Sequence, residues 1–162
     1  MDHDSQQWMC EARVELTTGA ETVWASLSDF FSIGKWLPPL GECIPLEGNS
    51  GEPGCVRCCR TPTGVLDSCG IEIVKLATER LVFLDNTERC FSYEMMDNNL
   101  GYKSYKATMK VIPDGEKDVG CRIEWSFTVE PVQGWTHEGM ISHQEYVLGI
   151  IAKTIDEAYA PR

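Results

Sequence analysis

Eight cysteines are the residues of this chain with the most evident capacity for chemistry. Cys55 and Cys58 form a C-x-x-C spacing, which occurs in zinc sites and in thiol–disulfide motifs. The surrounding segment has the pattern of a strand, so these two side chains would point to opposite faces of a sheet. No second C-x-x-C or Cys/His pair stands at ligand spacing. We therefore expect no metal or redox centre, and most thiols should be small buried fillers.

Histidines and glycines add no catalytic motif. His3, His137 and His143 show no metal-ligand spacing, and we interpret His137 and His143 as surface or hydrogen-bonded residues. The glycines form no G-x-G-x-x-G or P-loop pattern. The sequence therefore predicts no cofactor.

Charge and hydropathy narrow the classes of partner. The 162 residues carry a formal net charge of -11, which argues against a nucleic-acid surface and against a basic membrane-binding face. No stretch approaches the roughly 18–20 apolar residues of a membrane span, and the polar N-terminus lacks the regions of a secretory signal. We expect a cytoplasmic protein with one domain over residues 1–162 and no obligate protein partner.

Helical patterns lie near the two ends of the chain. The segment Trp8–Thr17 alternates as a half-buried strand and is followed by helices over Thr18–Asp29 and Phe31–Trp36, the second of which stops at Pro38. The longest helix is predicted over Thr136–Tyr159. Its apolar stripe consists of Met140, Gln144, Val147, Leu148, Ile151 and Ile155.

The middle of the chain is almost entirely strand and turn. Pro62-Thr63-Gly64 and similar clusters predict turns between successive strands, and Gly70 inside a strand pattern is typical of a bulge. Short turns between successive strands favour an antiparallel meander. The predicted strands are Glu42–Glu47, Cys55–Arg60, Val65–Leu76, Arg89–Met95, Tyr102–Val111 and Gly120–Glu130.

This order of elements predicts an α+β helix-grip fold. A curved antiparallel sheet of about seven strands surrounds the long C-terminal helix, two short helices follow the first strand, and a hydrophobic cavity lies between sheet and helix. The expected partner is a small hydrophobic metabolite. Beside Tyr93 and Tyr105, the predicted cavity-lining residues are Phe91, Met95, Met109, Trp125, Phe127, Val147, Leu148 and Ile151.

Five segments carry a resemblance to a known family: Gly54–Arg57, Ala77–Asn86, Phe91–Tyr93, Gly101–Met109 and Glu124–Phe127. As a set they resemble the plant lachrymatory-factor synthases, which belong to the Bet v 1/START-like (SRPBCC, polyketide cyclase-like) superfamily. The resemblance runs from about Trp8 into the last helix. It implies a cofactor-free isomerase that converts 1-propenesulfenic acid into propanethial S-oxide, and hence a sulfur-containing partner.

The resemblance also implies a set of catalytic residues, which by motif match are Arg57, Glu79, Tyr93 and Tyr105. A guanidinium can hold the sulfur-bound oxygen, and a carboxylate can take a proton from oxygen and return one to carbon. A tyrosine hydroxyl can orient either group. The alternatives are that Arg57 is an outward, solvated strand residue or that Arg57 and Glu79 form a structural ion pair. For the tyrosines, the alternative is a purely cavity-lining role.

Departures from the synthase pattern concern the cavity. The hairpin between Arg57 and Glu79 is longer than in the synthases, where this loop lies over the cavity mouth, so entry is expected to differ. Cys58 stands where the synthases have an aromatic residue, and we assign it to the cavity wall. Methionine is adaptable at ligand surfaces, so Met95 and Met96 suggest a reshaped pocket.

Two other functions fit the same features. One is a non-catalytic carrier of a small hydrophobic metabolite, and the other is a cyclase or condensing enzyme of plant specialised metabolism. Abscisic-acid receptors share the fold, but their Ser-Gly-Leu-Pro-Ala gate and His-Arg-Leu latch are absent from this sequence.

Overall fold

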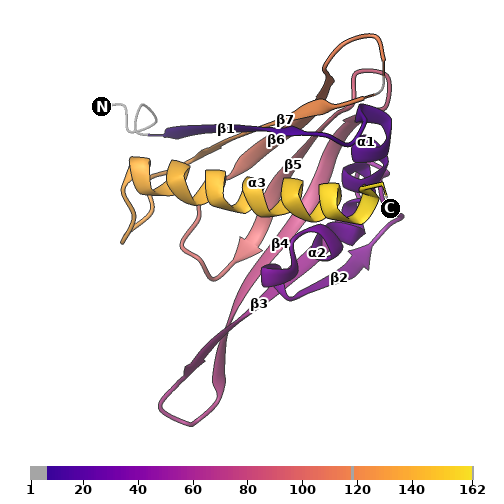
Figure 1. The fold of residues 1–162 in the computed structure, drawn as a ribbon. Coiled ribbons are helices and arrows are strands. Elements are labelled where there is room, and N and C mark those ends of the chain that lie inside the picture. Colours follow the sequence, from indigo (N-terminus) through magenta and orange to yellow (C-terminus); the bar gives the residue numbers. More distant parts are fainter. Residues whose placement is uncertain (1–6, 118, 162) are drawn as a thin grey trace.

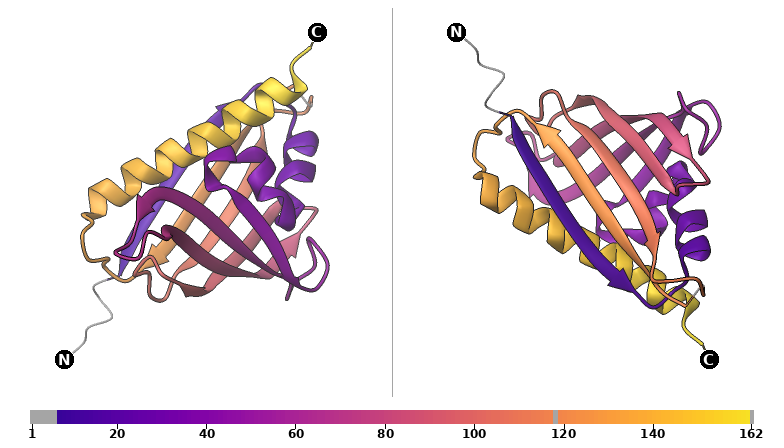
Figure 2. Two further views of the ribbon diagram at one scale, coloured as in Figure 1. Left: turned by 90° about the horizontal axis from the view of Figure 1, so that it is seen from below. Right: turned by 90° about the horizontal axis from the view of Figure 1, so that it is seen from above.

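Seven antiparallel strands form one sheet that curves around the C-terminal helix (Figures 1 and 2). The computed structural model describes residues 7–117 and 119–161. The strand order is β1-β7-β6-β5-β4-β3-β2, so β1 and β2 are the edges. The predicted helix-grip architecture is confirmed. The strands are β1 Trp8–Leu16, β2 Glu42–Glu47, β3 Val56–Leu66, β4 Glu72–Asp85, β5 Cys90–Asn98, β6 Lys106–Pro113 and β7 Cys121–Val129.

The helices lie on the concave side and at one end of this sheet. Between β1 and β2 the chain forms α1 (Ala20–Ser28), a 3-10 turn η2 (Phe30–Ser32), α2 (Ile33–Trp36) and a second 3-10 turn η3 (Pro38–Leu40). The long helix α3 spans His137–Tyr159 and runs along the open side of the sheet (Figure 2).

Alternation decides which face of each strand is buried. In β7, Cys121, Ile123 and Phe127 are buried on the concave face, while Arg122 and Glu124 point to the outer face. The register Cys10↔Phe127 aligns β1 with β7, so their inward side chains form one apolar surface. This surface matches the predicted stripe of α3, where Met140, Gln144, Leu148, Ile151 and Ile155 are all buried.

Side chains fix both ends of α3. The hydroxyl of Thr136 caps the helix by accepting a hydrogen bond from the Gly139 N–H at 2.9 Å. Near the other end, the Asp156 carboxylate accepts hydrogen bonds from the backbone N–H groups of Thr17 and Thr18, and from the Thr18 hydroxyl. These contacts join the end of α3 to the turn between β1 and α1.

The hairpin of β3 and β4 differs from the prediction. The turn expected at Pro62-Thr63-Gly64 is wrong, because β3 continues through it to Leu66 with a register shift. The chain reverses at 67–70, where Asp67 Oδ1 accepts hydrogen bonds from the N–H groups of Cys69 and Ile71. Gly70 has a φ of +79° in this turn, so it is not the expected bulge.

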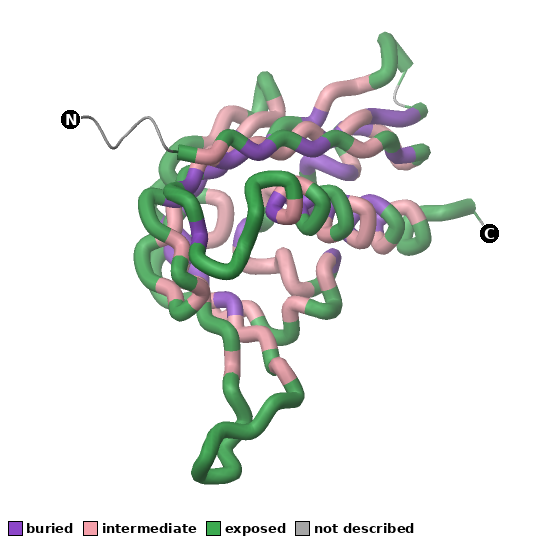
Figure 3. The backbone as a smooth tube through the Cα atoms, turned by 90° about the vertical axis from the view of Figure 1, so that its left-hand side faces the viewer, coloured by how far each residue is buried: buried purple, intermediate pink, exposed green. Residues whose placement is uncertain are grey.

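The predicted strand Val65–Leu76 is therefore divided between two strands, and β4 extends to Asp85. The end of this hairpin projects away from the rest of the sheet (Figure 1), and its tip is exposed (Figure 3).

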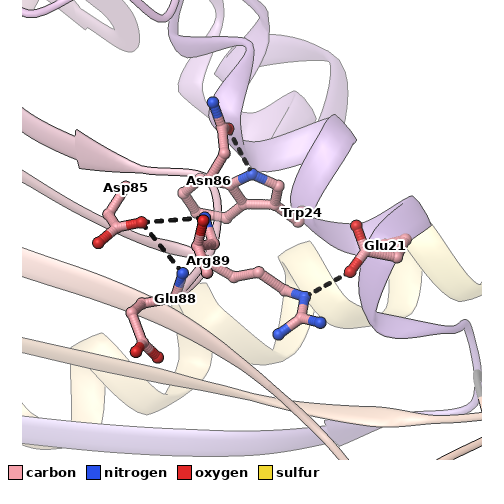
Figure 4. A network of polar contacts seen from close by, with 7 residues as sticks. Glu21, Trp24, Asp85, Asn86, Glu88 and Arg89 are labelled. Carbon is pink, nitrogen blue, oxygen red and sulfur yellow. Dashed lines mark hydrogen bonds and ion pairs between the residues drawn. The ribbon is translucent and has the colours of Figure 1, made fainter.

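Polar contacts hold the turn between β4 and β5 against α1 (Figure 4). The indole Nε1 of Trp24 donates to Asn86 Oδ1 at 2.9 Å, and Arg89 Nε donates to Glu21 Oε1 at 2.7 Å. Asp85 closes the turn by accepting from the backbone N–H of Glu88. The network fixes α1, and with it the following η2 turn, relative to the strands that carry the cavity residues.

Candidate functional site

An apolar cavity of about 190 Å³ lies between α3, the concave face of the sheet and the α1–α2 segment. This volume is below the roughly 300–1,000 Å³ of sites for drug-sized ligands, so the cavity suits a small molecule. Its wall is formed by Leu27, Ile33, Leu37, Leu40, Arg57, Cys59, Ala77, Glu79, Phe91, Tyr93, Met95, Leu100, Tyr102, Tyr105, Met109, Trp125, Phe127, Met140, His143, Gln144, Val147 and Ile151.

Arg57 and Glu79 form a buried ion pair in this wall. They are direct register partners on β3 and β4, and only 5% and 8% of their surfaces are exposed. Arg57 Nε and Nη2 both lie 2.8 Å from Glu79 Oε1. The Cys59 thiol is 3.9 Å from the same oxygen. All three contacts end on Oε1, and Oε2 takes part in none of them.

Phe30 completes the surroundings of the guanidinium. Arg57 Nη1 donates to the Phe30 backbone oxygen at 2.6 Å, and the guanidinium carbon lies 3.7 Å from the centre of the Phe30 ring. Burial opposes the charge of Arg57, but the neighbouring Glu79 carboxylate raises the pKa of Arg57 above its ordinary value. A guanidinium has five N–H donors, and three are used here, which leaves two for a ligand oxygen.

Tyr93 and Tyr105 continue the wall beside the ion pair. The Arg57 guanidinium lies 5.4 Å from the centre of the Tyr93 ring, and the two tyrosine rings are 6.2 Å apart. Burial is the main cause that raises the pKa of both hydroxyls, and the Glu79 charge adds to it. Both tyrosines therefore remain neutral hydrogen-bonding groups. The structure brings all four predicted catalytic residues to one cavity.

Cys58 does not line the cavity, and this part of the prediction is wrong. Side chains alternate along β3, so Arg57 and Cys59 share the concave face while Cys58 lies on the other face. Cys59 is buried in the wall beside Glu79. Its hydrogen bond with the Cys43 thiol, followed by burial, raises the pKa of Cys59 well above the ordinary value. The alternation was readable from the sequence once Arg57 was placed inward.

The other predicted lining residues fall into two groups. Leu148 is buried in the core but lies outside the cavity, because it is about 100° around the helix from Val147. The remaining seven do line the cavity: Phe91, Met95, Met109, Trp125, Phe127, Val147 and Ile151.

Several lining residues were missing from the prediction. The α1–α2 segment contributes Leu27, Ile33 and Leu37, and the apolar character of these short helices was the available signal. The sequence pattern predicts Gln144 only as part of the helix stripe, whereas the structure also places it in the cavity wall. His143 is a wall residue that also reaches the surface. Partial loss of hydration of its ring, followed by the charge of Lys75, lowers its pKa.

The long hairpin does not form part of the wall. None of residues 61–76 lines the cavity, so the expected loop over its mouth is not found. Within residues 7–117 and 119–161, no group of three His, Cys, Asp or Glu side chains could hold a metal ion. No helix in the described part of the chain is long and apolar enough to cross a membrane.

Comparison with known proteins places the whole architecture in one family. Residues 7–156 match the family described as "Polyketide cyclase / dehydrase and lipid transport". Major latex-like protein 151 from Panax ginseng has a similar structure, with a TM-score of 0.74 at 16% identity over 96% of this chain and 99% of that one.

Two bacterial structures have the same fold. XoxI from Bacillus cereus has a TM-score of 0.72 at 23% identity, covering 94% of this chain and 95% of its own. A Thermobifida fusca protein has a TM-score of 0.72 at 21% identity, covering 95% and 97%. With its helix-grip, Bet v 1-like fold, this chain belongs to the family of polyketide cyclases, dehydrases and lipid-transport proteins.

Proposed function

We propose that this protein is a cofactor-free isomerase that moves a proton within a small substrate of the sulfenic-acid type, as the lachrymatory-factor synthases do. The observation that carries the proposal is the Arg57–Glu79 pair. It is an ion pair buried in an apolar cavity, and it leaves one carboxylate oxygen and two guanidinium N–H groups for a ligand.

The proposed step transfers one proton and no net electrons. Glu79 Oε2 takes the proton from the sulfenic O–H group, and the electron pair of that bond stays on oxygen. The same proton is delivered to the second carbon of the alkene, and the double bond moves from C=C to C=S. Substrate and product are isomers, so the step needs no oxidant or co-reactant.

The surrounding residues support this chemistry. The two free N–H groups of Arg57 stabilise the negative charge that grows on the sulfur-bound oxygen. The neutral hydroxyls of Tyr93 and Tyr105 orient the substrate without competing for its proton. The small apolar volume excludes water and a second sulfenic acid, and thereby prevents self-condensation.

A non-catalytic carrier is the second candidate. The family includes lipid-transport proteins, and most of the wall is apolar. In this case the Arg57–Glu79 ion pair would be purely structural, and each residue would only neutralise the charge of the other. A cyclase would use the same carboxylate and tyrosines on a different substrate.

A coupled assay separates these functions. Purified protein is added to 1-propenesulfenic acid generated in situ, and propanethial S-oxide is measured by gas chromatography. We expect Glu79→Gln to lower kcat by about 100-fold or more, since a general acid–base group contributes at least that much. Glu94→Gln is the matched control, because Glu94 pairs with Arg80 on the exposed face of the same sheet. Product formation equal to the protein-free background would favour a carrier or a cyclase.

A further inference from the structure

The Gln144 amide is fully buried, and its orientation is determined by its neighbours. The residue is 1% exposed, and Nε2 donates to the backbone oxygens of Trp125 at 2.9 Å and Cys10 at 3.5 Å. Carbonyl oxygens only accept hydrogen bonds, so the amide nitrogen must face them. Gln144 Oε1 consequently points the other way, and this buried oxygen has no hydrogen-bond partner. Gln144 is a wall residue of the cavity.

The indole of Trp125 presents the complementary group. Its Nε1 is also buried without a hydrogen-bond partner, and Trp125 lines the same cavity. An interaction with this N–H contributes a lowering of the pKa of the Tyr93 hydroxyl, but the contact does not meet the distance and angle of a hydrogen bond. Because the Gln144 amide contacts the Trp125 backbone, the unpaired acceptor and the unpaired donor belong to neighbouring residues.

Buried polar atoms are nearly always hydrogen-bonded, so two unpaired atoms in one cavity wall indicate a missing partner. A hydroxyl group can accept from Trp125 Nε1 and donate to Gln144 Oε1 at the same time. We propose that Gln144 and Trp125 form a second polar subsite, which binds a hydroxyl group of the substrate. This inference rests on the proposed function, in which the reacting end of the substrate lies at Arg57 and Glu79.

Aromatic residues lie between the two subsites and indicate which chemical groups the middle of the substrate must have. Ring centres are 6.2 Å apart from Tyr93 to Tyr105, 4.8 Å from Tyr105 to Phe127 and 5.8 Å from Phe127 to Trp125. They form a continuous apolar surface from the ion pair to Trp125. The substrate class is therefore a small molecule with an acidic O–H group at one end, an apolar middle and a hydroxyl group at the other end.

Paired probes of equal size test the subsite. We would titrate the ¹⁵N-labelled protein with 1,6-hexanediol and with 1-heptanol, which differ by a hydroxyl in place of a methyl group. The readouts are the ratio of the two Kd values and the indole N–H resonance of Trp125, assigned with Trp125→Phe. We expect the diol, and not the alcohol, to move this resonance downfield.

Two variants should weaken the relative binding of the diol. Gln144→Leu removes the acceptor and Trp125→Phe removes the donor while keeping an aromatic ring. Each should shift the ratio of Kd values against the diol by about fivefold to tenfold, as expected for one hydrogen bond. Trp8→Phe is the control, since Trp8 stacks on His137 and does not line the cavity.

Three results would overturn the subsite. The ratio of Kd values could be unchanged in Gln144→Leu, it could be unchanged in Trp125→Phe, or both probes could move the Trp125 resonance equally. The outcome is independent of catalysis. If Glu79→Gln leaves product formation unchanged while the diol preference holds, the proposed function fails and the subsite stands. If the reverse is found, only the subsite fails.

Discussion

Arg57 directs two of its nitrogens to one oxygen of Glu79, each at 2.8 Å, across the neighbouring strands β3 and β4. This pair uses only Oε1, and Glu79 belongs to the wall of an apolar cavity. The contribution of these two residues to stability and their proposed role in catalysis can be measured separately.

The first prediction concerns stability. Arg57→Leu should lower the free energy of unfolding by about 3–5 kcal/mol, because it leaves the Glu79 charge buried without its partner. The double variant Arg57→Leu/Glu79→Leu should recover most of that loss, since a buried ion pair replaced by apolar residues is often neutral. Urea denaturation monitored by circular dichroism measures both values.

Arg80→Leu provides the control for this comparison. Arg80 pairs with Glu94 on the exposed face, so its loss should cost less than about 1 kcal/mol. If the double variant were as unstable as Arg57→Leu, the burial of an unpaired carboxylate could not be the cause.

A second prediction uses the adjacent thiols of β3. Cys59→Phe should fill part of the cavity and weaken the binding of 1-heptanol by about tenfold or more, because Cys59 lies in the wall. Cys58→Phe should leave binding within about twofold, since Cys58 lies on the opposite face of the strand. Titration followed by tryptophan fluorescence compares them. Equal effects of the two changes would contradict the assignment of faces.

A third prediction concerns pH. Burial raises the pKa of Asp156, but the hydrogen bonds from Thr18 and Thr17 outweigh it and lower the pKa below its ordinary value. A carboxyl with a lowered pKa in the folded state stabilises the fold above its unfolded pKa of about 4, and this stabilisation is lost as the pH falls through the folded value. These hydrogen bonds are partly exposed and therefore screened by solvent, so Asp156→Ala should cost about 1 kcal/mol at neutral pH.

The difference between Asp156→Ala and the wild-type chain should shrink progressively below about pH 4. Urea midpoints at neutral and acidic pH measure this change. A difference that grew at acidic pH would mean that the carboxylate does not hold the turn before α1.

A fourth prediction concerns the projecting hairpin. Thr61 and Lys75 are register partners, so a two-residue Asn-Gly turn can join them and replace residues 62–74. The shortened protein should keep its affinity and its association rate for 1-heptanol, because none of residues 61–76 lines the cavity. Stopped-flow fluorescence measures both. A large change in association rate would mean that the hairpin controls entry.

The buried face of an element could be predicted from the sequence where one hydrophobic periodicity runs through the whole element. The alternation of β7 and the stripe of α3 placed the two main walls, because each pattern has one buried face. The turn of the β3–β4 hairpin was predicted wrongly because the residues typical of a turn at 62–64 are held in the strand by cross-strand contacts. The hydroxyl of Thr63 donates to the Ile73 oxygen at 2.6 Å, which carries the strand past the expected turn.

The sequence motifs predicted the charged and tyrosine residues of the candidate site, and the structure added further residues of the cavity wall. The resemblance identified Arg57, Glu79, Tyr93 and Tyr105, and the structure gathers them in one cavity. The unpaired oxygen of Gln144 could not be predicted, because it depends on which groups of other elements reach the amide. The only indication of a polar subsite in the sequence is that a glutamine occupies a position in the apolar stripe of the last helix.

The proposed proton transfer is tested most directly by the rate at which propanethial S-oxide forms from 1-propenesulfenic acid, measured for the wild-type chain and for the folded double variant Arg57→Leu/Glu79→Leu. We expect the wild-type chain to raise this rate well above the protein-free background and the double variant to leave it at the background. A double variant as active as the wild-type chain would contradict the claim that this ion pair performs the proton transfer.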